Sequence, residues 1–307
     1  MTDGGLETDL IFHHGVVLPA FAAYPLLDST EGRNLLAAYY SGYARVARRA
    51  GANLLLETPT WRANPDWVTA VGGSRHDVRR INFESIVFLA GLADALIASG
   101  EFPIGSTGSG AGAAVCQLGG MIGPRGDGYV PGLETTADEF ASYHSTQTAA
   151  FAESGVGRVT AYTLVTVAEA VGVVQAARSH RLDVGVSFTV ETDGRLPDGT
   201  PLGHAVQSLW DQAAPDQLLL NCAHPSHLTE ALREDDSWAS RVSGLRVNAS
   251  RQSHAELDAA EHLDAGDIDD LVREHEHLVA RLPNLDIVGG CCGTDVRHVA
   301  ALWGVQA

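Results

Sequence analysis

The sequence contains no lysine, so all 20 of its basic residues are arginines. This absence excludes Schiff-base chemistry, which needs a lysine amine, and a Walker-type nucleotide site, in which a lysine binds the phosphates. Acidic residues number 38, and the formal net charge is −18. Because nucleic acids are bound through clustered cations, we expect no nucleic-acid partner.

Long hydrophobic runs are also missing. No stretch approaches the roughly 18–20 apolar residues that cross a bilayer. Residues 1–5 lack the basic start and apolar core of a signal peptide. We therefore expect a cytoplasmic protein without a membrane partner. The 307 residues are 45% hydrophobic and 19% charged, which suits a chain with a sizeable core. The composition leaves the oligomeric state open.

Cysteine is scarce, with four in the chain, and two of them are adjacent in Gly289-Gly290-Cys291-Cys292-Gly293-Thr294. Neighbouring cysteines rarely bond to each other, because the ring they close is strained. Flanking glycines let the backbone bend so that both sulfurs face one metal ion. A third sulfur, from Cys222, would give a three-thiolate zinc site with an open fourth position, as in catalytic zinc sites. Cys116 is predicted to be incidental.

Buried small hydrophobes are the alternative interpretation of the same three cysteines. That alternative fits poorly, because core strands seldom carry glycines on both sides of a cysteine pair.

Apolar, β-branched runs alternate with longer amphipathic stretches, the pattern of repeated βα units. The predicted strands are 52–58, 102–106, 158–164, 183–190, 217–222, 244–248 and 285–289, and a very short strand before Asp3 would make eight. The predicted helices are 31–50, 75–98, 136–154, 167–181, 202–211, 268–281 and 295–303.

Eight such units predict an α/β fold, a (β/α)8 TIM barrel with a single domain over residues 1–307. A doubly wound open sheet is the structural alternative. Residues 105–132 are interpreted as a long glycine-rich loop, either a functional cover or disordered.

Polar side chains follow several of the predicted strands. Asp3, Glu57 and Thr58 come at the ends of the first two, and Cys222 and the Cys291–Cys292 pair end the sixth and eighth. Because a barrel binds ligands at the carboxyl ends of its strands, these residues are expected to meet at one mouth. Asp3 and Glu57 could each contact a ligand or simply have structural partners.

Histidines contribute less to the prediction. His13 and His14 are expected at the surface, and His224 is expected to be structural or to support a metal ligand. Four more lie in polar, acidic segments and are predicted to be solvated: His254, His262, His275 and His277.

Short motifs then follow one another along the chain. They are Asp3-Gly4-Gly5-Leu6-Glu7-Thr8, Glu57-Thr58-Pro59-Thr60, Gly123-Pro124 with Tyr129 and Gly132, Val186-Ser187-Phe188-Thr189, Asn221-Cys222 and Gly289-Gly290-Cys291-Cys292-Gly293-Thr294. With them the chain resembles the homocysteine S-methyltransferase family, nearly from end to end. The resemblance implies a zinc-dependent methyltransferase built on a (β/α)8 barrel.

The resemblance also implies roles for individual residues. The family's zinc ligands correspond to Cys222, Cys291 and Cys292, and its aspartate that contacts the substrate ammonium corresponds to Asp3, the candidate catalytic residue. Further candidate substrate contacts are Glu57, Thr58, Trp61, Tyr162 and Asn248.

Two departures from the family pattern affect amino-acid recognition. Tyr162 stands where family members often carry a glutamate. In Val247-Asn248-Ala249-Ser250-Arg251 only Asn248 of a family motif is retained.

The expected reaction moves a methyl group from a small donor to a thiol acceptor. The resemblance implies homocysteine as acceptor, giving methionine, with S-methylmethionine or S-adenosylmethionine as donor. Coordination to Zn²⁺ would deprotonate the acceptor thiol, and aromatic rings such as Trp61 would favour the sulfonium cation. The alternatives are a different thiol or selenol acceptor, a zinc-dependent hydrolase, or a non-catalytic barrel whose structural zinc has a fourth protein ligand.

Overall fold

Seven parallel strands form one sheet in sequence order. The computed structural model describes residues 1–102, 114–130, 132, 135–234 and 236–307. The strands are β1 (Leu54–Glu57), β2 (Cys116–Ile122), β3 (Arg158–Leu164), β4 (Asp183–Phe188), β5 (Gln217–Asn221), β6 (Val242–Val247) and β7 (Ile287–Gly290). A helix separates each strand from the next, as a parallel sheet requires, and this confirms the predicted α/β barrel fold.

Residues Met1–Asp3 bridge the first and last strands of the sheet. The Thr2 amide donates to the Val288 carbonyl of β7 at 3.0 Å, and the Leu55 amide of β1 donates to the Met1 carbonyl at 2.9 Å. The segment therefore occupies the place of the very short strand expected before Asp3, although it is not a regular strand.

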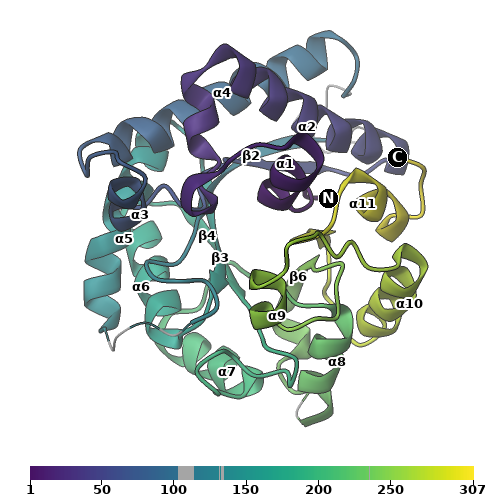
Figure 1. Ribbon diagram of the computed structural model, residues 1–307. Coiled ribbons are helices and arrows are strands. Elements are labelled where there is room, and N and C mark those ends of the chain that lie inside the picture. The colour runs from purple at the N-terminus through teal and green to yellow at the C-terminus, as the bar shows by residue number, and fades with distance from the viewer. Residues whose placement is uncertain (103–113, 131, 133–134, 235) are drawn as a thin grey trace.

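The long helices surround the sheet on the outside (Figure 1). The long ones are α2 (Thr30–Ala50), α4 (Asp77–Ala98), α5 (Ala137–Glu153), α6 (Val167–Ser179), α7 (Leu202–Ala213), α8 (Pro225–Glu234) and α10 (Ile268–Val279), and the chain ends with α11 (Val296–Leu302). Seven of the eight match predicted helices to within a few residues, and α8 was not predicted.

Helix α2 begins and ends as its sequence indicates. The Ser29 hydroxyl accepts a hydrogen bond from the Gly32 amide, which caps the N-terminus. At the other end Gly51 adopts the left-handed conformation with φ of 61°, and Arg48 and Arg49 lie in the last turn.

The predicted strand at 102–106 is wrong in position. Phe102 lies in a bend, and residues 103–106 lie outside the described residues. The strand that pairs with β1 and β3 is β2, inside the stretch interpreted as a loop. Its sequence, Cys-Gln-Leu-Gly-Gly-Met-Ile, contains two glycines and so lacked a strand signal.

Packing explains one of these glycines. A Cβ atom at Gly120 would lie 2.6 Å from the ring of Phe151 on α5, which is fully buried. Glycine at position 120 therefore lets α5 approach β2 closely. Cys116, predicted to be incidental, begins β2 and is half-buried.

Apolar side chains fill both the barrel interior and its outer layer. Tyr162, Leu219 and Ile287 form a cluster with Trp61 and Met121, all near the sheet, while a much larger cluster packs β3–β6 against α5–α8. Helix α4 is the one described helix long and apolar enough to cross a membrane by length and composition alone. Its buried residues, which include Val78, Ile86 and Leu89, pack within the protein.

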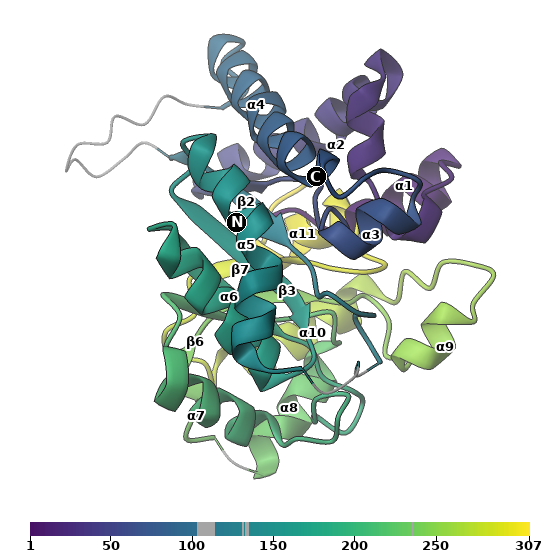
Figure 2. The ribbon, with the colours of Figure 1, turned by 90° about the vertical axis from the view of Figure 1, so that its left-hand side faces the viewer.

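Three short helices lie on one side of the barrel (Figure 2). They are α1 (Leu6–His14), α3 (Pro65–Ala70) and α9 (His254–Asp258), and each follows the carboxyl end of a strand or of the Met1–Asp3 segment. None was predicted, because each is shorter than the helical periodicity needs to be recognised. Together they surround the mouth of the barrel.

His275 on α10 was predicted to be solvated, and this is wrong. It is buried, its Nε2 has no hydrogen-bond partner among the described residues, and burial lowers its pKa to about 4. The unfolded chain therefore takes up a proton near pH 6.5 that the folded protein does not bind until about pH 4. Stability must then fall as the pH falls through this window.

We expect the free energy of unfolding to drop by roughly 2 kcal/mol between pH 7 and pH 5 on account of His275. Urea denaturation at both pH values measures it. His275→Leu should remove this part of the pH dependence, whereas His277→Leu, at an exposed site on the same helix, should not. An unchanged slope in His275→Leu would contradict the assignment.

Candidate metal centre and substrate cavity

Three cysteine sulfurs meet at the mouth of the barrel. The Sγ atom of Cys222, just after β5, lies 2.7 Å from that of Cys291 and 3.5 Å from that of Cys292, both just after β7. All three cysteines are free. The predicted convergence of residues about 70 positions apart is thus present.

The backbone at Cys222 is unusual and firmly held. Its φ of 56° is left-handed, a conformation that costs free energy in a non-glycine residue. The Cys222 amide donates to the Arg246 carbonyl at 3.0 Å, and the Cys222 carbonyl accepts from Asn248 Nδ2 at 3.0 Å. His254 Nε2 lies 2.6 Å from the same carbonyl. These contacts hold the strained residue so that its sulfur faces Cys291 and Cys292.

Glycines place the cysteine pair, as the sequence indicated. Gly293 is left-handed, with φ of 78°. A Cβ atom at Gly289 or Gly290 would collide with the hydroxyl groups of Thr2 and Thr294, respectively. Close packing at two positions and a turn at the third therefore explain why glycine flanks the pair.

The three thiols ionise unequally. Hydrogen bonds from the Cys222 and Cys292 thiols hold the pKa of Cys291 well below its usual value, and the cationic Arg246 lowers it further. The pKa of Cys222 is raised, mainly by its hydrogen bonds to the two neighbouring sulfurs and by burial. The Arg246 cation therefore favours a thiolate at Cys291, and the thiolate is the form that binds metal ions.

This donor set fits a metal ion. Thiolates held at about 2.3 Å from a tetrahedral zinc ion lie about 3.8 Å apart, so the Cys222–Cys292 spacing is already close to that value. The Cys222–Cys291 spacing would have to open by about 1 Å. The cluster in the described chain has three members and includes no histidine or carboxylate. It could therefore hold a metal ion and leave one coordination position for another ligand.

A cavity of about 710 Å³ opens over the sulfurs. Tyr129 contributes to its wall, with its hydroxyl 3.2 Å from Cys222 Sγ and 3.8 Å from Cys292 Sγ. Its ring stacks on the ring of His254 at 4.1 Å. Further lining residues include Asp3, Glu7, Trp61, Arg62, Trp67, Met121, Tyr162 and Arg246. The volume is sufficient for a small ligand or two.

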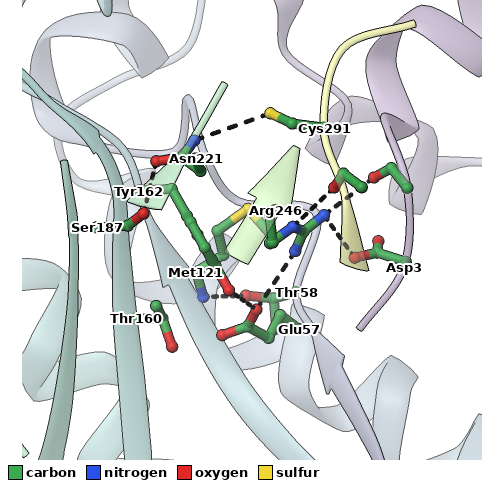
Figure 3. A network of polar contacts seen from close by, with 12 residues as sticks. Asp3, Glu57, Thr58, Met121, Thr160, Tyr162, Ser187, Asn221, Arg246 and Cys291 are labelled. Carbon is green, nitrogen blue, oxygen red and sulfur yellow. Dashed lines mark hydrogen bonds and ion pairs between the residues drawn. The ribbon is translucent and has the colours of Figure 1, made fainter. Parts of the chain in front are cut away.

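A buried arginine organises the floor of this cavity (Figure 3). Arg246, on β6, lies 2.6 Å from Asp3 Oδ1 and 3.5 Å from Glu57 Oε2. It also donates to the carbonyls of Gly290 and Gly4, at 3.0 and 2.9 Å. One guanidinium therefore connects β6 to β1, β7 and the N-terminal segment.

The same network determines the charges at the floor. Burial raises the pKa of Asp3 to about 6, although Arg246 opposes the shift. Burial likewise raises the pKa of Glu7 to about 7. Tyr162 donates its hydroxyl proton to Glu57 Oε2 at 2.5 Å, and its ring lies 4.9 Å from the Arg246 guanidinium. Asp3 and Glu57 both form ion pairs with Arg246, but of these two carboxylates Asp3 is the one that lines the cavity.

The other predicted site residues lie in different places. Trp61 and Tyr162 line the cavity, whereas Glu57 and Thr58 do not: Glu57 lies beneath Tyr162, and Thr58 accepts a hydrogen bond from the Met121 amide. Asn248 lines a smaller adjoining cavity and holds the Cys222 carbonyl. Glu57, Thr58 and Asn248 thus support the residues that line the cavity.

Two residues of the site were missed or misjudged from the sequence. His254 was predicted to be solvated, which is wrong: it is buried between Tyr129, Glu191 and the Cys222 carbonyl. A capping box at Ser253 and Glu256 begins its helix and was a usable sequence signal. Arg246 was overlooked, although an arginine inside an apolar strand is itself a sign of a buried partner.

The fold and the site together are those of a (β/α)8-barrel enzyme. Such enzymes bind their ligands at the carboxyl ends of the barrel strands, where the three thiols lie. The sequence profile of the homocysteine S-methyltransferase family matches residues 1–304, so the chain belongs to that family and is a methyltransferase. No curated protein matches the chain closely enough to count as a relative.

Crystal structures of the homocysteine methyltransferase MmuM from Escherichia coli share the fold. The metallated form superposes with a TM-score of 0.74 at 21% identity, and the oxidized form with 0.72 at 22%. The apo form gives 0.66 at 19%. Each comparison covers 99% of this chain and 94% of the other. Family membership removes the hydrolase and the non-catalytic barrel from the alternatives.

Proposed function

We propose that this protein transfers a methyl group from a sulfonium donor, S-methylmethionine or S-adenosylmethionine, to the thiol of homocysteine. Its resident cofactor would be a zinc ion held by Cys222, Cys291 and Cys292, and the single-domain enzyme would act in the cytoplasm. The observation that carries the proposal is the meeting of these three sulfurs over a cavity, in a chain of this family.

Zinc, when bound, would supply the Lewis acidity that keeps an acceptor thiol deprotonated at neutral pH. The methyl carbon then forms a bond to the acceptor sulfur as its bond to the donor sulfonium breaks. The donor leaves as a neutral thioether, and the thiol proton passes to solvent. The chain's own contribution is to place the two sulfurs in line and to exclude water.

Particular residues would perform these tasks. Asp3, fixed by Arg246 and by Tyr39 at 3.3 Å, would bind the acceptor ammonium. Trp61 lines the cavity, and contact of its ring with the sulfonium would be worth about 0.5–2 kcal/mol. Tyr162 would shape the floor between them.

A different thiol or selenol acceptor is the second candidate. One observation favours it: Asp3 already has a cationic partner in Arg246 at 2.6 Å. An incoming ammonium would have to share that carboxylate. An acceptor without an ammonium would leave the ion pair undisturbed.

The test incubates zinc-loaded protein with carbon-13-labelled homocysteine and one unlabelled donor at a time: S-methylmethionine, S-adenosylmethionine or betaine. Mass spectrometry should detect labelled methionine with a sulfonium donor and none with betaine. Cys116→Ala, which changes the cysteine outside the cluster, should retain the activity. Absence of labelled methionine with every donor would reject homocysteine as the acceptor.

A further inference from the structure

Two arginines line the larger cavity, and they are in opposite situations. Arg246 is paired with Asp3 and Glu57 and donates to two carbonyls. Arg62, which follows β1, is 6% exposed. No carboxylate of the described chain lies within ion-pair distance of its guanidinium. Among the described residues that line the cavity, Arg62 is therefore the cation without an ion-pair partner. The other unpaired ionisable groups, such as Glu7 and Asp258, are acidic.

The contacts of Arg62 leave part of its guanidinium available. Nη1 donates to the Gly126 carbonyl at 3.0 Å, while the buried Nε has no hydrogen-bond partner among the described residues. Two indole rings enclose the group, Trp61 at 4.0 Å and Trp67 at 3.8 Å. Since both rings lie against the group, its N–H donors remain the means by which it can bind a further partner.

Leaving this group unpaired is costly. Burial lowers the pKa of Arg62 to about 10, and the nearby charge of Asp127 only partly offsets this. Asp127 is itself engaged, because its Oδ1 accepts from the Tyr129 and Val130 amides. A buried guanidinium normally has an anionic partner, and it binds carboxylates through two parallel hydrogen bonds. The missing partner would therefore come from a ligand.

We propose that Arg62, flanked by Trp61 and Trp67, binds the carboxylate of an amino-acid substrate in this cavity. The acceptor and the donor of the proposed reaction both carry an α-carboxylate, so the inference rests on the proposed function for its choice of ligands. In this arrangement Asp3 and Arg62 recognise opposite charges of the substrates. Arg62 is then a specificity residue, separate from the metal-binding cysteines.

The experiment compares each substrate with its decarboxylated analogue. Homocysteine is set against 3-aminopropane-1-thiol, and S-methylmethionine against (3-aminopropyl)dimethylsulfonium. Calorimetry measures the Kd of each for zinc-loaded protein, so methyl transfer is not needed for the readout. Tryptophan fluorescence, to which Trp61 and Trp67 contribute, provides a second signal of binding.

Arg62→Gln should weaken the carboxylate-bearing ligand about 10- to 100-fold, the range for a lost charge-assisted hydrogen-bond pair. Its decarboxylated analogue should bind within about twofold of wild type, since it lacks the group that Arg62 recognises. Arg62→Lys, which keeps the charge but not the paired donors, should show an intermediate loss and serves if Arg62→Gln does not fold. Arg75→Gln, at an exposed arginine paired with Asp66, is the matched control and should change nothing.

If the Arg62 variants weaken homocysteine but not its analogue, Arg62 binds the carboxylate of the acceptor. If they weaken S-methylmethionine but not its analogue, Arg62 binds the carboxylate of the donor. Equal weakening of a ligand and its analogue would overturn the proposal, because it would indicate a structural role in holding Gly126. A wild-type protein that prefers neither carboxylate-bearing ligand would overturn it as well. Failure of methyl transfer, by contrast, would leave these binding differences intact, so the two proposals fail separately.

Discussion

Replacing Cys292 by alanine should abolish tight zinc binding and methyl transfer together. Removing one of three sulfurs leaves two protein ligands, too few for a stable site. Residues that merely support a metal ligand already change affinity about 10- to 100-fold, so a lost ligand should cost more than about 100-fold. Zinc content after dialysis against a weak chelator, together with turnover, measures the effect.

The fold of Cys292→Ala should survive, because the side chain lies at the cavity rather than in the core. Thermal unfolding monitored by circular dichroism checks this. Cys116→Ala is the matched control, since Cys116 is a free cysteine outside the cluster and should keep both zinc and activity. A Cys292→Ala protein with one zinc per chain and normal turnover would refute the assignment.

Replacing Arg246 by methionine should destabilise the barrel more than any of the other substitutions proposed above. The buried carboxylates of Asp3 and Glu57 would lose their cationic partner. The Gly4 and Gly290 carbonyls would lose their hydrogen-bond donor. Breaking a buried ion pair from one side typically costs about 3–5 kcal/mol. Urea denaturation at pH 8 measures the loss.

The loss should also depend on pH. Without Arg246 the pKa of Asp3 would rise further above its usual value, because that cation now lowers it. Asp3 in the folded variant then binds a proton more readily than in the unfolded chain, so the stability lost relative to wild type becomes smaller as the pH falls from 8 to 5. Adding Asp3→Asn and Glu57→Gln should restore part of the stability at pH 8. A variant within about 1 kcal/mol of wild type at pH 8 would show that the network is dispensable.

Much of the barrel was readable from periodicity, and the exception is instructive. Strands β3 to β7 are largely apolar runs, and all were predicted to within a few positions. Strand β2 was not, because Gly119 and Gly120 weaken a strand pattern. Glycine is accepted at position 120 because Phe151 packs against it, a contact between two elements that no local signal reveals.

The candidate site divides in the same way. Cys291 and Cys292 were recognisable because their spacing and flanking glycines are rare outside metal sites. His254 and Arg246 were not, since their environments depend on distant residues. The Arg246–Glu57 pair, for example, joins positions 189 residues apart. Local composition suggested that His254 is solvated, whereas tertiary contacts with Tyr129 and Cys222 bury it.

The sequence by itself determined most strands, the long helices except α8, and the chemical identity of the three thiols, because hydrophobic periodicity and cysteine spacing are local properties of the chain. Only the tertiary structure decided which charges meet inside the barrel. Asp3 and Glu57 both pair with Arg246, while Arg62 keeps an unpaired charge beside two indole rings. The physical reason is that pairing and burial depend on distances across the sheet, which closure of the barrel sets.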